Sequence, residues 1–188
     1  FASSRHAEGG QILASLDNYL GEVVEGIPAG ISGCQQCHGS TIRVANDGRV
    51  APETWPNTGI GRINPDGSKG SCSACHPRHR FAAAAARRPE SCGRCHMGPD
   101  HPQFEIYQES KHGVVFAEAQ DRMNLGSVKW RLGSDYTAAP TCVTCHNGAD
   151  PKREFTHDVG LRIAWTLRPE ISVRQPDWES RREGMKET

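Results

Sequence analysis

The 188-residue sequence contains few of the large apolar side chains from which protein cores are normally built. Leu, Ile, Val and Phe account for 31 residues, a fraction that indicates disorder when it accompanies a high net charge. The net charge is zero, with 22 basic and 22 acidic residues, so this second condition is absent. We therefore expect a folded chain in which another apolar component supplements the side chains of the core.

Three further absences exclude classes of protein. There is no excess of basic residues and no stripe that mixes basic with aromatic residues, so we expect no nucleic-acid partner. No apolar run approaches the length of a membrane span, so we expect no membrane insertion. No segment alternates apolar and polar residues as a half-buried strand does. The expected fold class is therefore mainly α with extensive irregular loops.

Every cysteine, by contrast, belongs to one short pattern. The pentad C-x-x-C-H occurs four times and uses all eight cysteines. This pentad is the attachment signature of c-type heme, in which two thiols form thioethers to the porphyrin and the adjacent histidine binds the iron on the proximal side. The sequence predicts four heme c groups, attached at Cys34, Cys37, Cys72, Cys75, Cys92, Cys95, Cys142 and Cys145, with the proximal ligands His38, His76, His96 and His146.

Zinc binding, thiol redox chemistry and disulfide crosslinking each account for these cysteines less well than heme does. Structural zinc sites also use paired C-x-x-C motifs, but they do not require a histidine directly after each second cysteine. A thioredoxin-like redox pair has the same weakness and would not need four copies. A disulfide framework is disfavoured, because cysteines so close together in the sequence make poor long-range crosslinks. Heme attachment is therefore the prediction.

Four hemes would account for the shortage of apolar residues, because each brings a large apolar macrocycle that the chain can surround. We expect a single tetraheme cytochrome c domain over residues 1–188, organised around a closely spaced row of four covalently bound hemes. Folding should depend on heme attachment. Short helices are expected near 12–20, 81–88, 102–116, 157–167 and 176–188, with turns through the Gly-, Pro-, Asn- and Asp-rich stretch 39–71.

Five histidines lie outside the pentads and are candidates for the distal iron ligands. Methionine, the other common distal ligand, occurs only three times. The histidines outside the pentads are numerous enough for four distal ligands, so we favour bis-histidine ligation. Four hemes need four distal ligands, which leaves one histidine over. His101 and His112 are spaced so that one face of a helix could serve two cofactors. The full set of candidates is His6, His79, His101, His112 and His157.

The segments between the pentads resemble the octaheme hydroxylamine oxidoreductase family. The resemblance covers roughly residues 30–185 and is carried by specific strings rather than by generic composition. One of them runs from the third pentad through Met97-Gly98-Pro99-Asp100-His101. The others lie at 55–62, 64–68, 72–79, 109–113 and 156–160.

The resemblance implies that the four pentads correspond to the third to sixth hemes of that family. The heme at Cys72, Cys75 and His76 would then match the family's catalytic heme, which has an open distal face. Asp100 and His101 match the acid/base pair of that site, where a carboxylate and an imidazole can shuttle protons in N–O or N–H chemistry. The family's two hemes on either side and its crosslinking tyrosine have no counterpart in this sequence, which counts against hydroxylamine oxidation.

Two hypotheses of function follow. The first is electron transfer through four closely spaced hemes, mostly or all with bis-histidine ligation, to redox partner proteins or extracellular electron acceptors. Stacking of subunits through exposed terminal hemes would give a homopolymer, an extracellular cytochrome filament. The second is an enzyme that acts on hydroxylamine, nitrite or a related small nitrogen species at the heme of Cys72, Cys75 and His76.

The sequence also predicts a location. Heme c is attached outside the cytoplasm, and the chain begins at Phe1 rather than at a methionine. We therefore expect a mature, exported protein that is extracellular, at the cell surface or periplasmic.

Overall fold

The structure is a computed structural model that describes residues 1–12, 33–99 and 101–163. Within these residues every regular element is a short helix, and the rest of the backbone forms turns, bends and isolated β-bridges. The expected fold class, mainly α with extensive irregular loops, is confirmed. No helix of the described residues is long and apolar enough to cross a membrane.

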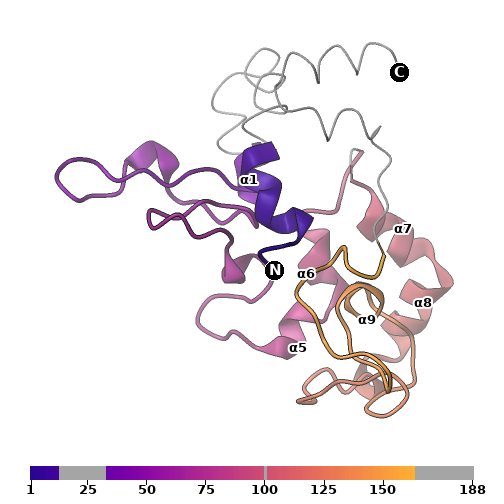
Figure 1. The fold of residues 1–188 in the computed structure, drawn as a ribbon. Helices are drawn as coiled ribbons and strands as arrows, with labels where there is room; N and C mark the ends of the chain where they lie inside the picture. The colour runs from indigo at the N-terminus through magenta and orange to yellow at the C-terminus, as the bar shows by residue number, and fades with distance from the viewer. Residues whose placement is uncertain (13–32, 100, 164–188) are drawn as a thin grey trace, which may run out of the picture. The chain divides into compact units, whose positions relative to one another are not determined.

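The chain divides into two compact units (Figure 1). One consists of residues 1–4 and 72–163 and is called the 72–163 unit; the other includes residues 5–71 and is called the 5–71 unit. Three pentads belong to the 72–163 unit and one to the 5–71 unit. A single tetraheme domain stays a prediction.

The 5–71 unit consists of short helices connected by loops with tight turns. Asp47 Oδ1 accepts a hydrogen bond from Arg49 N at 3.0 Å, and Asp66 Oδ1 accepts one from Ser68 N at 3.0 Å. These turns are the ones that the two Asp-Gly pairs of the stretch 39–71 predict. The helices are the 3-10 helix Arg5–Glu8, α1 (Gly9–Ile12), α4 (Gln35–His38) and the 3-10 helix Pro52–Thr54.

The closest packing in the 5–71 unit joins glycine backbones. A Cβ atom added at Gly59 would lie 2.0 Å from the nitrogen of Gly39, and one added at Gly61 would lie 2.6 Å from the nitrogen of Gly10. Only glycine permits backbones to approach so closely. As a result, α1 and the loop around residue 60 pack directly against the end of α4.

The 72–163 unit contains most of the helices and an aromatic core. Trp130 and Tyr136 are 2% and 3% exposed, and their rings stack with centroids 4.3 Å apart. Phe116, Met123, Leu125 and Ala139 complete the cluster, which packs against Val143 of α9. The helices are the 3-10 helix Cys72–Ala74, α5 (Ala83–Ala86), α6 (Pro89–Gly93), α7 (Gln103–Glu109), α8 (Lys111–Glu118), the 3-10 helix Gln120–Arg122 and α9 (Cys142–His146).

The helix expected over 102–116 is broken, and the prediction of one continuous face is wrong. Ser110 has an extended ψ of 159°, ends α7 and caps α8, because its Oγ accepts from Gly113 N at 3.2 Å. A Cβ atom added at Gly113 would lie 2.1 Å from the carbonyl oxygen of Tyr107. The glycine thus lets the start of α8 pack on the end of α7, and His101 and His112 do not share a helix face.

Other predicted helices differ from the observed ones. Over 81–88 only Ala83–Ala86 is helical, because Ala82 is extended with ψ of 127° and Phe81 has a φ of 43°. Residues 157–163 form turns instead of a helix, since the Asp158 side chain accepts from Gly160 N at 3.1 Å. The remainder of that predicted helix, residues 13–20 and residues 176–188 lie outside the described residues.

Candidate functional site

All four pentads adopt helical turns at their cysteines. α4 carries the first pentad, a 3-10 helix begins the second, α6 ends within the third, and α9 spans the fourth. In the second and third pentads the main-chain nitrogen of the histidine donates to the carbonyl oxygen of the first cysteine, at 2.9 and 3.0 Å respectively. Residues three apart lie on one face of such a turn. Each turn therefore presents two thiols to one side, as attachment to a planar porphyrin requires.

All eight cysteines are free thiols, with no disulfide among them. Among the described residues, no group of three or more histidine, cysteine, aspartate or glutamate side chains could hold a metal ion. Residues of this kind fit a heme that is bound by two thioethers and one imidazole.

The three pentads of the 72–163 unit contact one another. Ser91 Oγ donates to the carbonyl oxygen of Cys75 at 2.9 Å, which joins the second pentad to the third. The thiols of Cys92 and Cys142 are hydrogen-bonded neighbours, and this contact, followed by burial, raises the pKa of Cys92. α6 also packs directly on α9. The second, third and fourth pentads, the predicted attachment points of three hemes, are therefore adjacent in space.

The predicted proximal histidines of this unit differ in the hydrogen-bond partner of Nδ1. His146 Nδ1 lies 3.0 Å from the carbonyl oxygen of Val159. A carbonyl oxygen can only accept, so Nδ1 is the protonated nitrogen and Nε2 is free to bind iron. His96 Nδ1 lies 3.4 Å from Gln103 Oε1, and the buried Nδ1 of His76 has no hydrogen-bond partner. His146 thus has the hydrogen bond typical of a metal-ligating imidazole.

The loop after the fourth pentad returns to His146. Thr156 N donates to Asn147 O at 3.0 Å, and Asn147 Nδ2 donates back to Thr156 O at 2.9 Å. Asp158 N then donates to Thr156 Oγ1 at 3.0 Å, and the turn that follows contains Val159. These bonds bring the Val159 carbonyl to the imidazole of His146.

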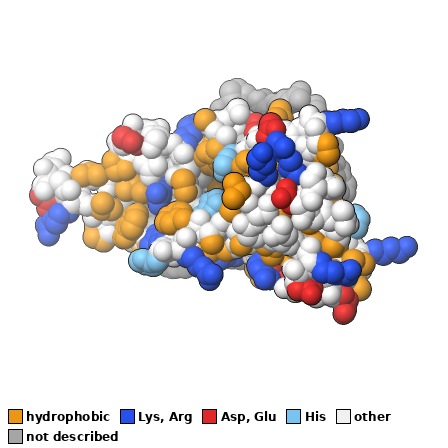
Figure 2. Space-filling view, turned by 90° about the horizontal axis from the view of Figure 1, so that it is seen from below, with side chains coloured by type: hydrophobic (Ala, Val, Ile, Leu, Met, Phe, Trp, Pro, Cys, Tyr) orange, Lys and Arg blue, Asp and Glu red, His pale blue; other side chains and the backbone are white. Residues whose placement is uncertain are grey.

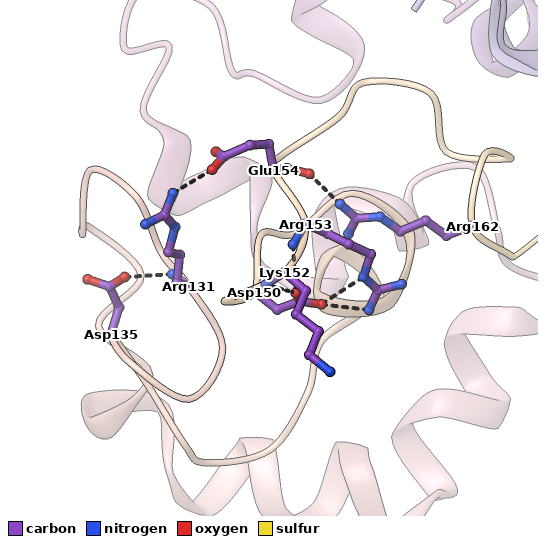
Figure 3. Close-up of polar contacts among 7 residues, drawn as sticks. All are labelled: Arg131, Asp135, Asp150, Lys152, Arg153, Glu154 and Arg162. Carbon is purple, nitrogen blue, oxygen red and sulfur yellow. Dashed lines mark hydrogen bonds and ion pairs between the residues drawn. The ribbon is translucent and has the colours of Figure 1, made fainter.

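Two arginines hold the far end of this loop (Figure 3). Arg162 donates to the main-chain carbonyl oxygens of Gly148 and Glu154. The carboxylate of Glu154 pairs with Arg131 at 2.6 Å. We call residues 147–162 the His146 loop, because its bonds begin directly after His146 and close on it.

The candidate distal histidines lie in different environments. His6 is partly buried in the 5–71 unit, whereas His79 and His112 are exposed. The ring centroid of His101 lies 6.2 Å from that of His96, with the rings at 72°. On the face drawn in Figure 2, histidine side chains reach the surface beside hydrophobic ones. Asp100, the predicted partner of His101, lies outside the described residues.

His157 is the candidate that the structure brings near the second pentad. Burial lowers the pKa of His157, and the nearby N-terminal ammonium group and His76 lower it further. Its ring packs edge-on against Phe155 with centroids 4.8 Å apart. His157 is nevertheless exposed overall, so its burial is only partial.

Sequence reasoning missed the residues that support the attachment sites. Ser91, Arg162 and the Val159 carbonyl have no motif of their own, and a main-chain acceptor leaves no signal in a sequence. By residue type alone, Arg87 would be a surface charge or a partner of a heme propionate. Its side chain instead donates to the carbonyl oxygens of Leu125 and Ser127 at 2.6 and 2.5 Å and lies 5.2 Å above the Trp130 ring.

Comparison with known proteins agrees with this geometry. A family described as "Seven times multi-haem cytochrome CxxCH" matches residues 65–188, which include the second, third and fourth pentads. A "Probable nitrite reductase-hydroxylamine oxidoreductase fusion protein" of Kuenenia stuttgartiensis is 53% identical over 87 residues, 40% of this chain and 10% of that protein.

Two solved structures share the fold. A "Hypothetical multiheme protein" has 40% sequence identity and a TM-score of 0.62, over 69% of this chain and 28% of the other. A Kuenenia stuttgartiensis reducing HAO-like protein complex has 30% identity and a TM-score of 0.55, over 80% of this chain and 24% of the other. The chain therefore spans a quarter or so of these two neighbours and a tenth of the curated relative.

Proposed function

The chain belongs to the multi-haem CxxCH cytochrome family, and we propose that it transfers electrons through four c-type hemes attached at its four pentads. The observation that carries this proposal is the direct contact that links the second, third and fourth pentads. Cys75 accepts from Ser91, and Cys92 lies against Cys142. Hemes bound at adjacent helices are held close together, and close cofactors exchange electrons without a mobile carrier. The chemistry of electron storage belongs to the hemes when they are bound, while the chain fixes their spacing.

We further propose that the hemes have bis-histidine ligation. Five histidines outside the pentads are available. The ring centroid of His101 lies 6.2 Å from that of His96, and His76 contributes to lowering the pKa of His157. Ligation by two imidazoles favours electron transfer, because it leaves no coordination position for a substrate.

Counting and spectroscopy test both points. The mass of the purified protein should exceed that of the polypeptide by four heme c groups, and a smaller excess would contradict the cofactor count. Low-temperature EPR of the oxidised protein should show only low-spin ferric signals. A high-spin component that responds to hydroxylamine or nitrite would contradict a pure electron carrier.

The second candidate function is an enzyme with HAO-like chemistry at the heme of Cys72, Cys75 and His76. The observation in its favour is the similarity to a probable nitrite reductase-hydroxylamine oxidoreductase fusion protein and to a reducing HAO-like complex. In this candidate Asp100 and His101 would move protons beside the substrate.

The variant His101→Ala separates the two functions. If His101 is a distal ligand, its loss converts one heme from low to high spin. If it is an acid/base group, the spin states stay as they are and turnover of the nitrogen substrate is lost. His112→Ala is the matched control, because His112 is exposed on α8 and the resemblance assigns it no proton-transfer role.

Location and assembly are further proposals. Heme c attachment supports an exported protein that acts in the periplasm, at the cell surface or outside the cell, and cell fractionation tests this. Redox partner proteins are supported by the neighbour that is itself a complex of HAO-like proteins. The extracellular filament is a prediction for negative-stain microscopy: discrete small particles at high protein concentration would contradict it.

A further inference from the structure

We propose that Arg162 is a positioning residue that lowers the reduction potential of the heme at Cys142 and Cys145. It does so by holding the carbonyl of Val159 against Nδ1 of the proximal His146. This inference rests on the proposed heme attachment, and it concerns residues of this chain to which neither the sequence nor the family comparison gives a role.

The first step is the hydrogen bond itself. His146 Nδ1 donates to the Val159 oxygen at 3.0 Å, which gives the imidazole ring partial imidazolate character. A more basic ligand stabilises ferric iron relative to ferrous iron, so the bond lowers the reduction potential. The buried Nδ1 of His76, by contrast, has no hydrogen-bond partner. The fourth heme should therefore have a larger contribution of this kind than the heme at Cys72 and Cys75.

Hydrogen bonds on both sides of Val159 fix the turn in which it lies. On one side Thr156 is paired with Asn147 through two hydrogen bonds of 3.0 and 2.9 Å. On the other side the Arg162 guanidinium donates to the carbonyl oxygens of Gly148 and Glu154.

The planar fork of arginine suits this role, because two of its N–H groups reach two carbonyl oxygens at once. The anchor at Arg162 is the one nearest to Val159 on its C-terminal side, and Figure 3 shows the guanidinium pointing toward the main chain of Glu154. Without it, the turn that carries Val159 is held at one end, and the carbonyl can withdraw from His146.

The sign of the effect separates positioning from charge. Loss of a nearby positive charge stabilises ferric iron and lowers a reduction potential. Loss of the His146 hydrogen bond raises it. The substitution Arg162→Gln does both, so a rise identifies positioning as the dominant role.

The experiment is a potentiometric titration of the heme-loaded protein, followed by NMR of the heme methyl groups so that individual hemes are resolved. For Arg162→Gln we expect the reduction equilibrium of one heme to shift about tenfold toward the ferrous form, which is a rise of about 59 mV. Arg162→Lys keeps the charge and one donor, and should raise the same potential by less.

Arg153→Gln is the matched control. Arg153 lies in the same loop and its loss removes the same charge, but its side chain is 59% exposed and pairs only with Asp150 among the contacts of Figure 3. It should leave the potential unchanged or slightly lower. A fall or no change in both Arg162 variants would overturn the proposal, and so would an equal rise in Arg153→Gln.

The heme content of each variant keeps the inference separate from the proposed function. A wild-type protein without a heme at Cys142 and Cys145 contradicts the proposed function. A wild-type protein with that heme, whose potential does not rise in the Arg162 variants, contradicts only the inference. If Arg162→Gln loses the heme, the sign of the shift in Arg162→Lys decides.

Discussion

The two compact units bury different kinds of surface. The 72–163 unit places Trp130, Met123 and Phe116 at 2%, 0% and 3% exposure and surrounds them with further apolar residues. The described part of the 5–71 unit buries Ile42 and Ala7 as its hydrophobic side chains and otherwise brings glycine backbones together. One unit has a side-chain core in addition to its pentads, whereas the other packs main chain around α4.

This difference has a physical consequence for folding. Burial of a large side chain contributes about 1.5–3 kcal/mol, so the aromatic cluster supports the 72–163 unit even when a heme is lost. Glycine loses the most backbone entropy on folding and buries little surface, so glycine contacts supply no comparable term. We infer that the 5–71 unit depends more strongly on its heme.

The largest expected effect comes from removing attachment sites. Cys34→Ala with Cys37→Ala should abolish hydrogen-exchange protection in the 5–71 unit, for instance at the amide of Ile42. Cys72→Ala with Cys75→Ala should leave the amides around Trp130 protected, because the aromatic core remains. Hydrogen exchange measured by mass spectrometry checks both variants. Equal loss of protection in the two units would refute the comparison.

The second prediction concerns the side-chain core. Trp130→Ala should lower the free energy of unfolding of the 72–163 unit by about 3–5 kcal/mol, since it removes a stacked and buried ring. Its effect is measured by denaturant titration with far-UV circular dichroism. Val128 is 95% exposed, so Val128→Ala should change stability by no more than about 0.5 kcal/mol. A small effect of Trp130→Ala would mean that the hemes stabilise both units alike.

The third prediction concerns the glycine contacts. Gly59→Ala should cost about 1–3 kcal/mol, because its Cβ would meet main-chain atoms that cannot move aside. The same titration, followed through the protection of the 5–71 amides, detects the loss. Gly33 has no atom within 4 Å of an added Cβ, so Gly33→Ala is the control and should be close to neutral. Tolerance of Gly59→Ala would show that the close glycine backbones are not what stabilises the unit.

The smallest expected effect is a pH dependence confined to the 72–163 unit. Burial raises the pKa of Tyr136 above its usual value of 10.0. The unfolded chain then releases this proton at lower pH than the folded one, so stability is complete below pH 10 and falls as the pH rises further. Tyr136→Phe should flatten this decline, which denaturant titrations at several pH values between pH 9 and 11 would measure. The variant should also lose about 1 kcal/mol of stability, because the hydrogen bond between Tyr136 and Thr144 is removed.

Sequence patterns predicted the local features of both units well. The four pentads form helical turns at their cysteines, and Asp47 and Asp66 with their following glycines correctly predicted the two turns. Ser110 ends a helix that looked continuous, although the serine three residues before Gly113 is itself a capping signal. The missed break shows that a local cap and a close backbone contact can outweigh apolar spacing.

Features that depend on distant parts of the chain were not predictable. Arg87 is buried because its side chain donates a hydrogen bond to the carbonyl oxygen of Leu125, which lies 38 positions further along the chain. The Val159 acceptor is a main-chain carbonyl oxygen, which every residue type has, so the sequence cannot identify it. The electrostatic influence of His76 on His157 joins residues 81 positions apart in the chain, so no local pattern could have predicted it.

The compactness of the His146 loop also bears on the order of assembly. Val159 lies only 13 positions after His146, and Arg162 reaches back 14 positions to Gly148. Closing so short a loop costs little entropy, and such local contacts form early in folding. The proximal side proposed for the fourth heme can therefore form from local contacts, before the long-range contacts between the pentads are complete.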